Sequence, residues 1–405
     1  MNAFSARLLV ISTPEEAERE LIRIGADSHG VRSMAPKMRT RCIHLSGLQC
    51  RQANILKQEM LSIGGDAAVA RGAVACSIES TDVILIGTEK QLAALCPRLE
   101  LQPFGLRNLA QELKTLLERM RSAPAVWRTA QKDLTLERPL IMGVLNTTPD
   151  SFFDGSNYLE PERAIERALE MAAEGADIID IGGESTRPGA EPVSPEEEIK
   201  RVIPVISELA KKTNIPLSVD TWKAGVARRA MDVGAEIIND ISGLTFDPSM
   251  ARVASETKAG IILTHTRGTP QVMQSDIEYA DITGEIVQYL RASVETAQNA
   301  SVERERIVVD PGIGFAKDCR GNLDIIRRLR EFISLGFPVL VGASRKSFIG
   351  LITSRDVHNR LFGTVAIAAL AVANGASILR VHDVRAMRDA ADMAHAIVNG
   401  TNIAL

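Results

Sequence analysis

Polar side chains follow a series of short apolar runs in the later two thirds of the chain, and their types indicate a ligand site. They combine carboxylates, amides and cations, without a nucleophile beside an obvious base and without the spacing of metal ligands. This mixture favours a ligand with a polar heterocycle at one end and an anion at the other. The residues are Asn146, Asp180, Asp220, Asn239, His265, Asp310, Ser344, Lys346, Arg380 and His382.

The carboxylates Asp220 and Asp310 favour a ring with adjacent N–H groups, because a carboxylate accepts two parallel hydrogen bonds from an N–C–N edge. Each such bond contributes on the order of 1.5 to 3 kcal/mol. Arg380 and His382 lie two residues apart on one apolar run and project to the same side, where they favour phosphate binding with Asn146 beside them. The residues therefore predict a heterocycle that carries phosphate.

Each of these residues alone also fits a simpler role. The Asp-Pro-Gly at 310–312 is typical of a turn, and Asp220 or Asn239 at a strand end is typical of a helix cap. A single histidine such as His382 is more often structural than ligand-binding. Neither nucleotide-binding glycine motif is complete, since 342–350 lacks the spacing of a P-loop. The functional interpretation therefore requires that all these residues meet in one place.

Eight apolar runs separated by helical patterns are expected to position the polar residues. Glycine follows several of the helical stretches, as a left-handed cap requires, and unbroken apolar strands are typical of a parallel sheet buried on both faces. Eight strands alternating with helices predict a (β/α)₈ TIM barrel, whose site lies at the carboxyl ends of its strands. The predicted strands are 140–146, 178–182, 217–221, 237–241, 261–265, 307–311, 339–344 and 378–382.

A chain of 405 residues fits two domains, and the predicted fold class is α/β, with a C-terminal TIM barrel preceded by a smaller α/β domain. The smaller domain is a module for dimerisation or stability, or one for regulation or partner binding; the residues leave both roles open. Its apolar runs at 8–12, 42–47 and 82–87 predict strands among helical stretches at 91–99 and 106–120. The predicted boundaries are 1–125 for the N-terminal domain, 126–137 for a linker and 138–405 for the barrel.

The composition excludes several classes of partner. With 47 basic and 51 acidic residues, the net charge of -4 lacks the basic excess of nucleic-acid or membrane-surface binding. The five cysteines form no C-x-x-C pair, and the N-terminal apolar run is too short for a signal peptide. The most apolar stretch, 361–372, is shorter than the roughly 18 residues that a membrane span needs. We therefore expect a cytoplasmic protein without membrane or nucleic-acid partners.

Seven strings of the later region resemble the successive motifs of the dihydropteroate synthase family, in the same order. The resemblance covers about residues 138–400, and NTTPDSF, GGESTRPG and SRKSFIG are its most specific parts. The strings lie at 145–155, 182–190, 218–221, 237–241, 310–317, 342–350 and 380–384.

The resemblance implies a transferase of folate biosynthesis, which joins 6-hydroxymethyl-7,8-dihydropterin pyrophosphate to p-aminobenzoate and releases pyrophosphate. It also implies Mg²⁺ as cofactor, a homodimer, and inhibition by sulfonamides that mimic p-aminobenzoate. The implied pterin-binding residues are Asp220, Asn239, Asp310 and Lys346. The implied pyrophosphate-binding residues are Asn146, Arg380 and His382, with Asn146 also reaching the Mg²⁺.

The loops after the first and second strands resemble the family's mobile lids over p-aminobenzoate, with Ser344 on the opposite wall. The loop residues concerned are Asp154, Thr186, Arg187 and Pro188. The resemblance implies catalytic contributions from Asp154, Thr186, Arg187, Lys346, Arg380 and His382.

The sequence departs from the family pattern in two places. Thr264 precedes His265 where relatives often carry methionine, and the N-terminal domain lies outside the pattern. Two alternative functions also stay open: a pterin-dependent methyltransferase, and a catalytically inactive pterin-binding paralogue. A methyltransferase has no need of the GGESTRPG and SRKSFIG motifs, and an inactive paralogue predicts a broken site, whereas here the motif positions are filled.

Overall fold

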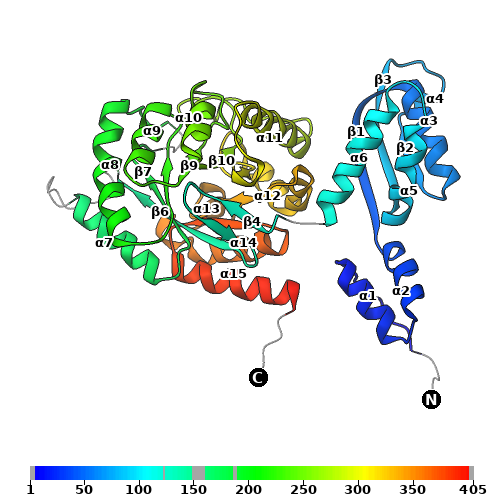
Figure 1. Ribbon diagram of the computed structural model, residues 1–405, viewed down its shortest axis with the longest axis horizontal. Helices are drawn as coiled ribbons and strands as arrows, with labels where there is room; N and C mark the ends of the chain where they lie inside the picture. The colour runs from blue at the N-terminus through cyan, green and yellow to red at the C-terminus, as the bar shows by residue number, and fades with distance from the viewer. Residues whose placement is uncertain (1–4, 122–123, 148–159, 186–188, 401–405) are drawn as a thin grey trace. The chain divides into compact units, whose positions relative to one another are not determined.

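The computed structural model describes residues 5–121, 124–147, 160–185 and 189–400. The chain divides into two compact units, Met1–Arg121 and Ser122–Leu405 (Figure 1). Each unit has a hydrophobic core of its own.

The N-terminal unit contains an antiparallel three-stranded sheet in the order β1-β3-β2. Burial alternates along β3, where Val83 and Leu85 are fully buried, as a strand with one covered face requires. The strands are β1 (Thr40–Gln49), β2 (Asp66–Val69) and β3 (Ser80–Thr88). The helices are α1 (Pro14–Arg23), α2 (Ser28–Met34), η1 (Ala35–Lys37), α3 (Cys50–Ser62), α4 (Arg71–Val74), α5 (Glu89–Glu100) and α6 (Leu106–Arg121).

One predicted strand of this unit is wrong. Residues 8–12 form no strand, and Leu8 is 89% exposed. The runs at 42–47 and 82–87 do lie in β1 and β3, which pair with each other, whereas β2 was not predicted. An apolar run becomes a strand only when a neighbouring strand accepts its backbone hydrogen bonds, and this partner is not visible in the local sequence.

The second unit is an eight-stranded parallel barrel, which confirms the predicted fold class. The sheet runs in the order β11-β10-β9-β8-β7-β6-β13-β12, and a parallel bridge between Val309 and Val339 joins its two ends. Every strand overlaps a predicted apolar run. The strands are β6 (Leu140–Asn146), β7 (Ile178–Gly182), β8 (Leu217–Asp220), β9 (Ile237–Asp240), β10 (Gly260–Thr264), β11 (Ile307–Asp310), β12 (Leu340–Val341) and β13 (Ile378–Val381).

Amphipathic helices surround the strands (Figure 1). In α8, for example, Ser194 caps the first turn and Val202, Ile206 and Leu209 are buried. No helix in the described part of the chain is long and apolar enough to cross a membrane. The helices are α7 (Glu160–Ala173), α8 (Pro195–Lys212), α9 (Ala224–Asp232), α10 (Met250–Thr257), α11 (Ile282–Asn299), η3 (Arg304–Arg306), α12 (Cys319–Arg327), η4 (Leu329–Leu335), α13 (Ser347–Thr353), η5 (Val357–Asn359), α14 (Leu361–Ala373) and α15 (Val384–Asn399).

The barrel interior changes from apolar to polar along the strands. A fully buried apolar cluster includes Ile178, Ile237, Val308 and Ile378, each near the start of its strand. Alternate residues of a strand face the same side, so the next inward residues are polar. They are Asp180, Asn239, Asp310 and Arg380. The strand period that builds the apolar floor therefore also places polar groups at the carboxyl mouth.

The segment 126–137, predicted as a linker, is instead part of the barrel unit. It forms an antiparallel hairpin of β4 (Val126–Arg128) and β5 (Asp133–Thr135). Trp127 on β4 is fully buried in the apolar cluster at the amino ends of the strands. The linker prediction relied on the mixed polar composition of the segment. It failed because the single buried tryptophan, Trp127, anchors the segment in the apolar cluster of the barrel.

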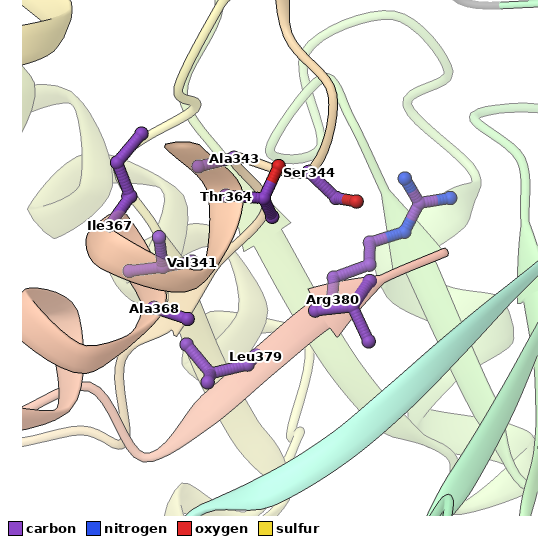
Figure 2. Close-up of a pocket in the computed structure, with 9 residues that line it drawn as sticks. Val341, Ala343, Ser344, Thr364, Ile367, Ala368, Leu379 and Arg380 are labelled. Atoms are coloured by element: carbon purple, nitrogen blue, oxygen red, sulfur yellow. The ribbon is translucent and has the colours of Figure 1, made fainter. Parts of the chain in front are cut away.

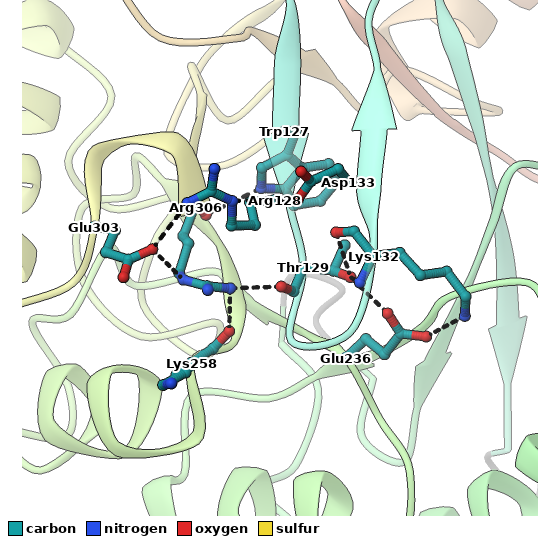
Figure 3. A network of polar contacts seen from close by, with 9 residues as sticks. All are labelled: Trp127, Arg128, Thr129, Lys132, Asp133, Glu236, Lys258, Glu303 and Arg306. Atoms are coloured by element: carbon teal, nitrogen blue, oxygen red, sulfur yellow. Dashed lines mark hydrogen bonds and ion pairs between the residues drawn. The ribbon is translucent and has the colours of Figure 1, made fainter.

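Polar contacts join this hairpin to the loops at the amino end of the barrel (Figure 3). The Trp127 indole N–H donates to the Arg306 carbonyl at 3.0 Å. Arg306 Nη1 in turn donates to the Thr129 carbonyl at 2.5 Å. Glu236 accepts from the Thr129 hydroxyl and from Lys132 Nζ, each at 2.5 Å. The hairpin is therefore a fixed plug at the amino end of the barrel.

We predict that Trp127→Ala destabilises the barrel by about 3 to 5 kcal/mol, because the change leaves a large cavity and an unpaired carbonyl. Denaturant unfolding followed by circular dichroism measures the loss. Trp127→Phe is the matched control, since it keeps an aromatic ring, and it should lose less. A loss below about 1 kcal/mol for Trp127→Ala would show that the hairpin does not stabilise the barrel.

Candidate active site

The polar residues that the sequence singles out converge at the carboxyl mouth of the barrel. Asp220 and Asp310 each feel the charges of both Lys346 and Arg380. These four residues come from β8, from β11, from the loop after β12, and from β13. Side chains that are far apart in the sequence therefore share one electrostatic environment.

Arg380 lies at the centre of this group. Its Nε donates to Asp180 Oδ2 and its Nη2 donates to Asp220 Oδ2, both at 2.6 Å. Asn239 Nδ2 donates to the same Asp180 oxygen at 3.0 Å. Burial by itself would lower the pKa of Arg380, but the two carboxylates outweigh it and raise that pKa. The guanidinium is thus a permanent cation held between two acids from other strands.

One oxygen of each carboxylate remains available. Within the described part of the chain, Asp180 Oδ1 and Asp220 Oδ1 are buried and accept no hydrogen bond. An unsatisfied buried acceptor is costly, and native proteins keep few of them outside functional sites. The two oxygens are therefore free to accept N–H groups of a ligand.

The acids at the mouth titrate near neutral pH. Burial raises the pKa of Asp220 to about 7, against the opposing attraction of Arg380. Burial also raises the pKa of Asp310 to about 6, although the Gly312 N–H donates to Asp310 Oδ1 at 2.7 Å and favours the charged form. A ligand that donates hydrogen bonds to these carboxylates would favour their ionised forms.

Lys317 and His265 form a buried pair beside Asp310, and sequence reasoning did not place Lys317 in the site. Lys317 Nζ lies 2.9 Å from His265 Nδ1 and donates to the Phe315 carbonyl at 2.7 Å. Burial lowers the pKa of His265 to about 2 and brings the pKa of Lys317 well below its usual value. The position of Lys317 in the DPGIGFAK string was the only sequence signal for it.

His382 and Ser344 contact each other across two neighbouring loops. The Ser344 hydroxyl accepts the His382 backbone N–H at 3.2 Å and lies 3.0 Å from its Nδ1. Burial, reinforced by Arg380, lowers the pKa of His382 to about 4. The imidazole is therefore neutral at physiological pH, and it contributes a hydrogen bond to the site rather than a charge.

Lys346, in the loop after β12, extends toward the loop after β11. Its Nζ lies 4.4 Å from the centre of the Phe315 ring, a cation–π distance. The aliphatic part of the side chain passes over Gly314, where a Cβ would lie 2.9 Å from Lys346 Cδ. Gly314 has a φ of +81°, so this turn favours glycine for two reasons.

The other predicted site residues differ in how far the structure describes them. Asn146 ends β6 in register with Gly182, at the same end of the barrel. Asp180 was recognised only as a strand-end residue, yet its carboxylate joins Arg380 to Asn239. Four predicted residues lie outside the described ranges: Asp154, Thr186, Arg187 and Pro188.

A small pocket lies behind Arg380, between the loop after β12, α14 and β13 (Figure 2). Its walls are mostly apolar, with polar atoms from Ser344 and Thr364. Its volume of about 10 Å³ holds about one water molecule. Figure 2 shows the guanidinium directed away from the apolar wall, so a substrate would meet Arg380 from its other side.

Known proteins match this architecture. The family described as pterin binding enzyme matches residues 142–382. A dihydropteroate synthase of Synechocystis is 50% identical over 262 residues, which cover 64% of this chain and 91% of the relative. A bifunctional dihydropteroate synthase/dihydropteroate reductase of Helicobacter pylori is 36% identical over 374 residues, covering 92% of this chain and 94% of its own length.

A solved structure has the same barrel. Dihydropteroate synthase from Xanthomonas albilineans, in complex with 7,8-dihydropteroate, is 38% identical with a TM-score of 0.62. The match covers 68% of this chain and 99% of the other. The fold and the polar mouth thus define a transferase of the pterin-binding barrel class. Within that class, the chain belongs to the dihydropteroate synthase family.

We predict that Arg380→Met lowers the stability of the barrel by about 3 kcal/mol near pH 8, because Asp180 and Asp220 lose their buried cation. The loss should be smaller near pH 5.5. The folded-state pKa of Asp220 is raised, and a carboxyl with a raised pKa contributes stability at low pH that is lost as the pH rises. Chemical denaturation at both pH values measures it. The control Arg328→Met, which removes a more exposed ion pair, should cost less than about 1 kcal/mol. A loss independent of pH would contradict the assigned pairing.

Proposed function

We propose that this site condenses 6-hydroxymethyl-7,8-dihydropterin pyrophosphate with p-aminobenzoate, giving 7,8-dihydropteroate and pyrophosphate. The observation that carries the proposal is the Arg380 guanidinium between Asp180 and Asp220, each with one oxygen free for a ligand N–H. The chemistry of a pterin ring, with adjacent N–H groups, matches these acceptors.

The pterin is assigned to the deep part of the mouth. Asp220, Asp310 and Asn239 provide acceptors and an amide for the ring, and the Lys346 side chain lines the same space. Asp180 holds Asn239 and Arg380 and thereby orients both. Asp180 thus orients these two side chains in addition to offering its own Oδ1 to the ring.

The pyrophosphate is assigned to Arg380, His382 and Asn146. Arg380 provides the charge, and His382, which is neutral, provides an N–H. The Ser344 hydroxyl accepts the backbone N–H of His382 and is free to donate to Nδ1, which leaves the hydrogen on Nε2. Lys346 adds a second cation near the leaving group.

Magnesium is assigned to the diphosphate rather than to a resident site. Asn146 offers one amide oxygen, and no group of three or more His, Cys, Asp or Glu side chains suited to a metal occurs among the described residues. This donor set fits an ion held mainly by phosphate oxygens and water. Mg²⁺ bound in this way supplies positive charge that neutralises the leaving anion.

The reaction needs no covalent bond to the protein. The bond between the exocyclic carbon and the diphosphate oxygen breaks, and the diphosphate leaves with the electron pair. The p-aminobenzoate nitrogen attacks the cationic methylene and releases a proton.

The residues assigned to p-aminobenzoate are Asp154, Thr186, Arg187 and Pro188, with Ser344 on the opposite wall. Fixed cations stabilise the departing anion and fixed carboxylates the carbocation, which is electrostatic catalysis.

The direct test is an assay of the purified protein with both substrates and Mg²⁺, following pyrophosphate release and dihydropteroate formation in equal amounts. An inactive paralogue would bind the pterin without turnover. A methyltransferase would instead transfer a methyl group from a methylated pterin to a corrinoid protein. Either result would overturn the proposal.

We predict that Asp310→Ala weakens pterin binding by about a hundredfold or more, because the ring loses a pair of charge-assisted hydrogen bonds. Wild-type affinity should also fall as the pH drops below about 6, since protonation removes an acceptor from Asp310. Titration calorimetry with the pterin pyrophosphate measures both effects. The control Asp318→Ala removes a nearby exposed carboxylate and should leave binding unchanged. Unchanged affinity in Asp310→Ala would refute its role.

We also assign the chain to a homodimer and to the cytoplasm. Phe362, Ala366 and Leu370 lie four residues apart on α14, and all three are exposed, Phe362 by 84%. A helix with such an apolar outer stripe is usually covered in the assembled protein.

All five cysteines are unpaired, which supports a reducing compartment.

We predict that Phe362→Asp converts the homodimer to a monomer, because it places a charge in the apolar stripe of α14. Light scattering coupled to gel filtration measures the mass. The control Leu323→Asp changes an exposed leucine of α12 and should keep the dimer. Equal masses for wild type and Phe362→Asp would exclude α14 as the dimer contact.

A further inference from the structure

Lys223 makes a set of buried contacts that the proposed condensation does not use. It lies just after β8, three residues beyond Asp220, at the N-cap of α9. Its Nζ lies 2.5 Å from Glu184 Oε2 and 2.5 Å from Glu198 Oε2, and it donates to the Val193 carbonyl at 2.7 Å. One ammonium therefore joins the loop after β7 to the start of α8.

The two carboxylates depend on this lysine. Glu184 is 5% exposed and Glu198 is fully buried. A buried carboxylate is strongly unfavourable unless a cation or hydrogen-bond donors compensate it. Burial raises the pKa of Glu198, and the contact with Lys223 opposes that rise. Loss of the ammonium would leave two acids without their cation, so the cluster would rearrange.

The cluster closes the base of the loop that spans residues 184–193. Glu184 Oε1 accepts the Val193 backbone N–H at 2.9 Å, so the first and last residues of the loop are joined. Lys223 contacts the same two residues from the neighbouring loop. Both ends of the loop are thus held by one side chain and one hydrogen bond.

The same loop also makes two contacts outside its base. The Gly189 N–H donates to the Pro270 carbonyl at 3.1 Å, and Gln271 Nε2 donates to the Ala190 carbonyl at 3.1 Å. Both partners belong to the loop after β10. These two contacts hold the loop at residues 189–190, whereas Lys223 holds its base.

The cluster has only a minor influence on the pterin side of the mouth. Glu198 is among the charges that act on Asp220, but those of Arg380 and Asp180 act on it more strongly. Lys223 Nζ also lies 4.8 Å from the centre of the Trp222 ring, next in the chain. Lys223 therefore lies between the loop after β7 and the strand end that carries Asp220.

We propose that Lys223 is a positioning residue that fixes the base of loop 184–193 and thereby sets the affinity of the site for p-aminobenzoate. The proposal rests on the proposed function, in which this loop carries Thr186, Arg187 and Pro188. Lys223 touches neither substrate. Its effect is expected on p-aminobenzoate rather than on the pterin, because the pterin acceptors lie on the strands themselves.

The test compares Lys223→Met with Lys132→Met in the full-length protein. Lys132 is a matched control, since its Nζ also lies 2.5 Å from a buried glutamate, Glu236, but at the amino end of the barrel. Lys223→Met should raise the KM for p-aminobenzoate about tenfold or more and change the KM for the pterin pyrophosphate by less than about threefold. Lys132→Met should change neither KM, although both variants lower the thermal midpoint.

A second measurement does not depend on activity. Hydrogen exchange followed by mass spectrometry reports the Val193 and Gly189 amides, whose protection should fall in Lys223→Met and persist in Lys132→Met. If Lys223→Met does not fold, Glu184→Gln removes one charge with little change of shape and should show the same pattern. Lys223→Arg should restore part of the p-aminobenzoate affinity.

The outcomes separate the two proposals. Unchanged exchange at Val193, or faster exchange with an unchanged KM for p-aminobenzoate, would overturn the role of Lys223. Equal increases in both KM values would do the same, because they indicate a general loss of structure. If the wild-type protein makes no dihydropteroate, the proposed function fails, and with it the substrate part of this inference, while the exchange data still decide whether Lys223 holds the loop.

Discussion

The ion pairs of Arg380 with Asp180 and Asp220 are the contacts on which the rest of the mouth depends. Without a cation between them, the carboxylates from β7 and β8 would repel each other inside the barrel, where burial disfavours charge. Arg380 supplies that cation from β13, on the other side of β6 in the sheet. The pairing also leaves one oxygen of each acid free. The guanidinium therefore stabilises the fold and keeps the acceptors in place.

The apolar floor makes this arrangement possible. Trp127 and the inward residues near the strand starts exclude water from the amino end of the barrel, and the hairpin contacts hold the tryptophan there. The polar layer above it therefore has a dry side and an open side, and charges at such a boundary interact more strongly than in water. The shifted pKa values of Asp220, Asp310 and His382 are a consequence of this position.

The loops around the mouth are joined through buried side chains rather than through backbone contacts alone. Lys223 connects the loops after β7 and β8, and Arg345 pairs with Asp383 to connect those after β12 and β13. Arg345 has a φ of +56°, a strained value for a long side chain, and Thr364 and Arg360 bind its backbone. Such links fix catalytic groups before substrate arrives, which is what electrostatic catalysis requires.

The sequence by itself determined the eight strands, the barrel and the polar residues at the strand ends, because strand period and helix caps are local properties of the chain. The motif strings also identified the family. Tertiary structure alone decided which groups pair. Asp180 joins Arg380 to Asn239, Lys317 lies against His265, and the segment 126–137 folds as a plug instead of a linker. It also decided that residues 8–12 form no strand. These outcomes depend on partners that are distant in the chain. They also depend on the free-energy cost of burying a charge or an unpaired backbone group. A local sequence pattern contains neither kind of information.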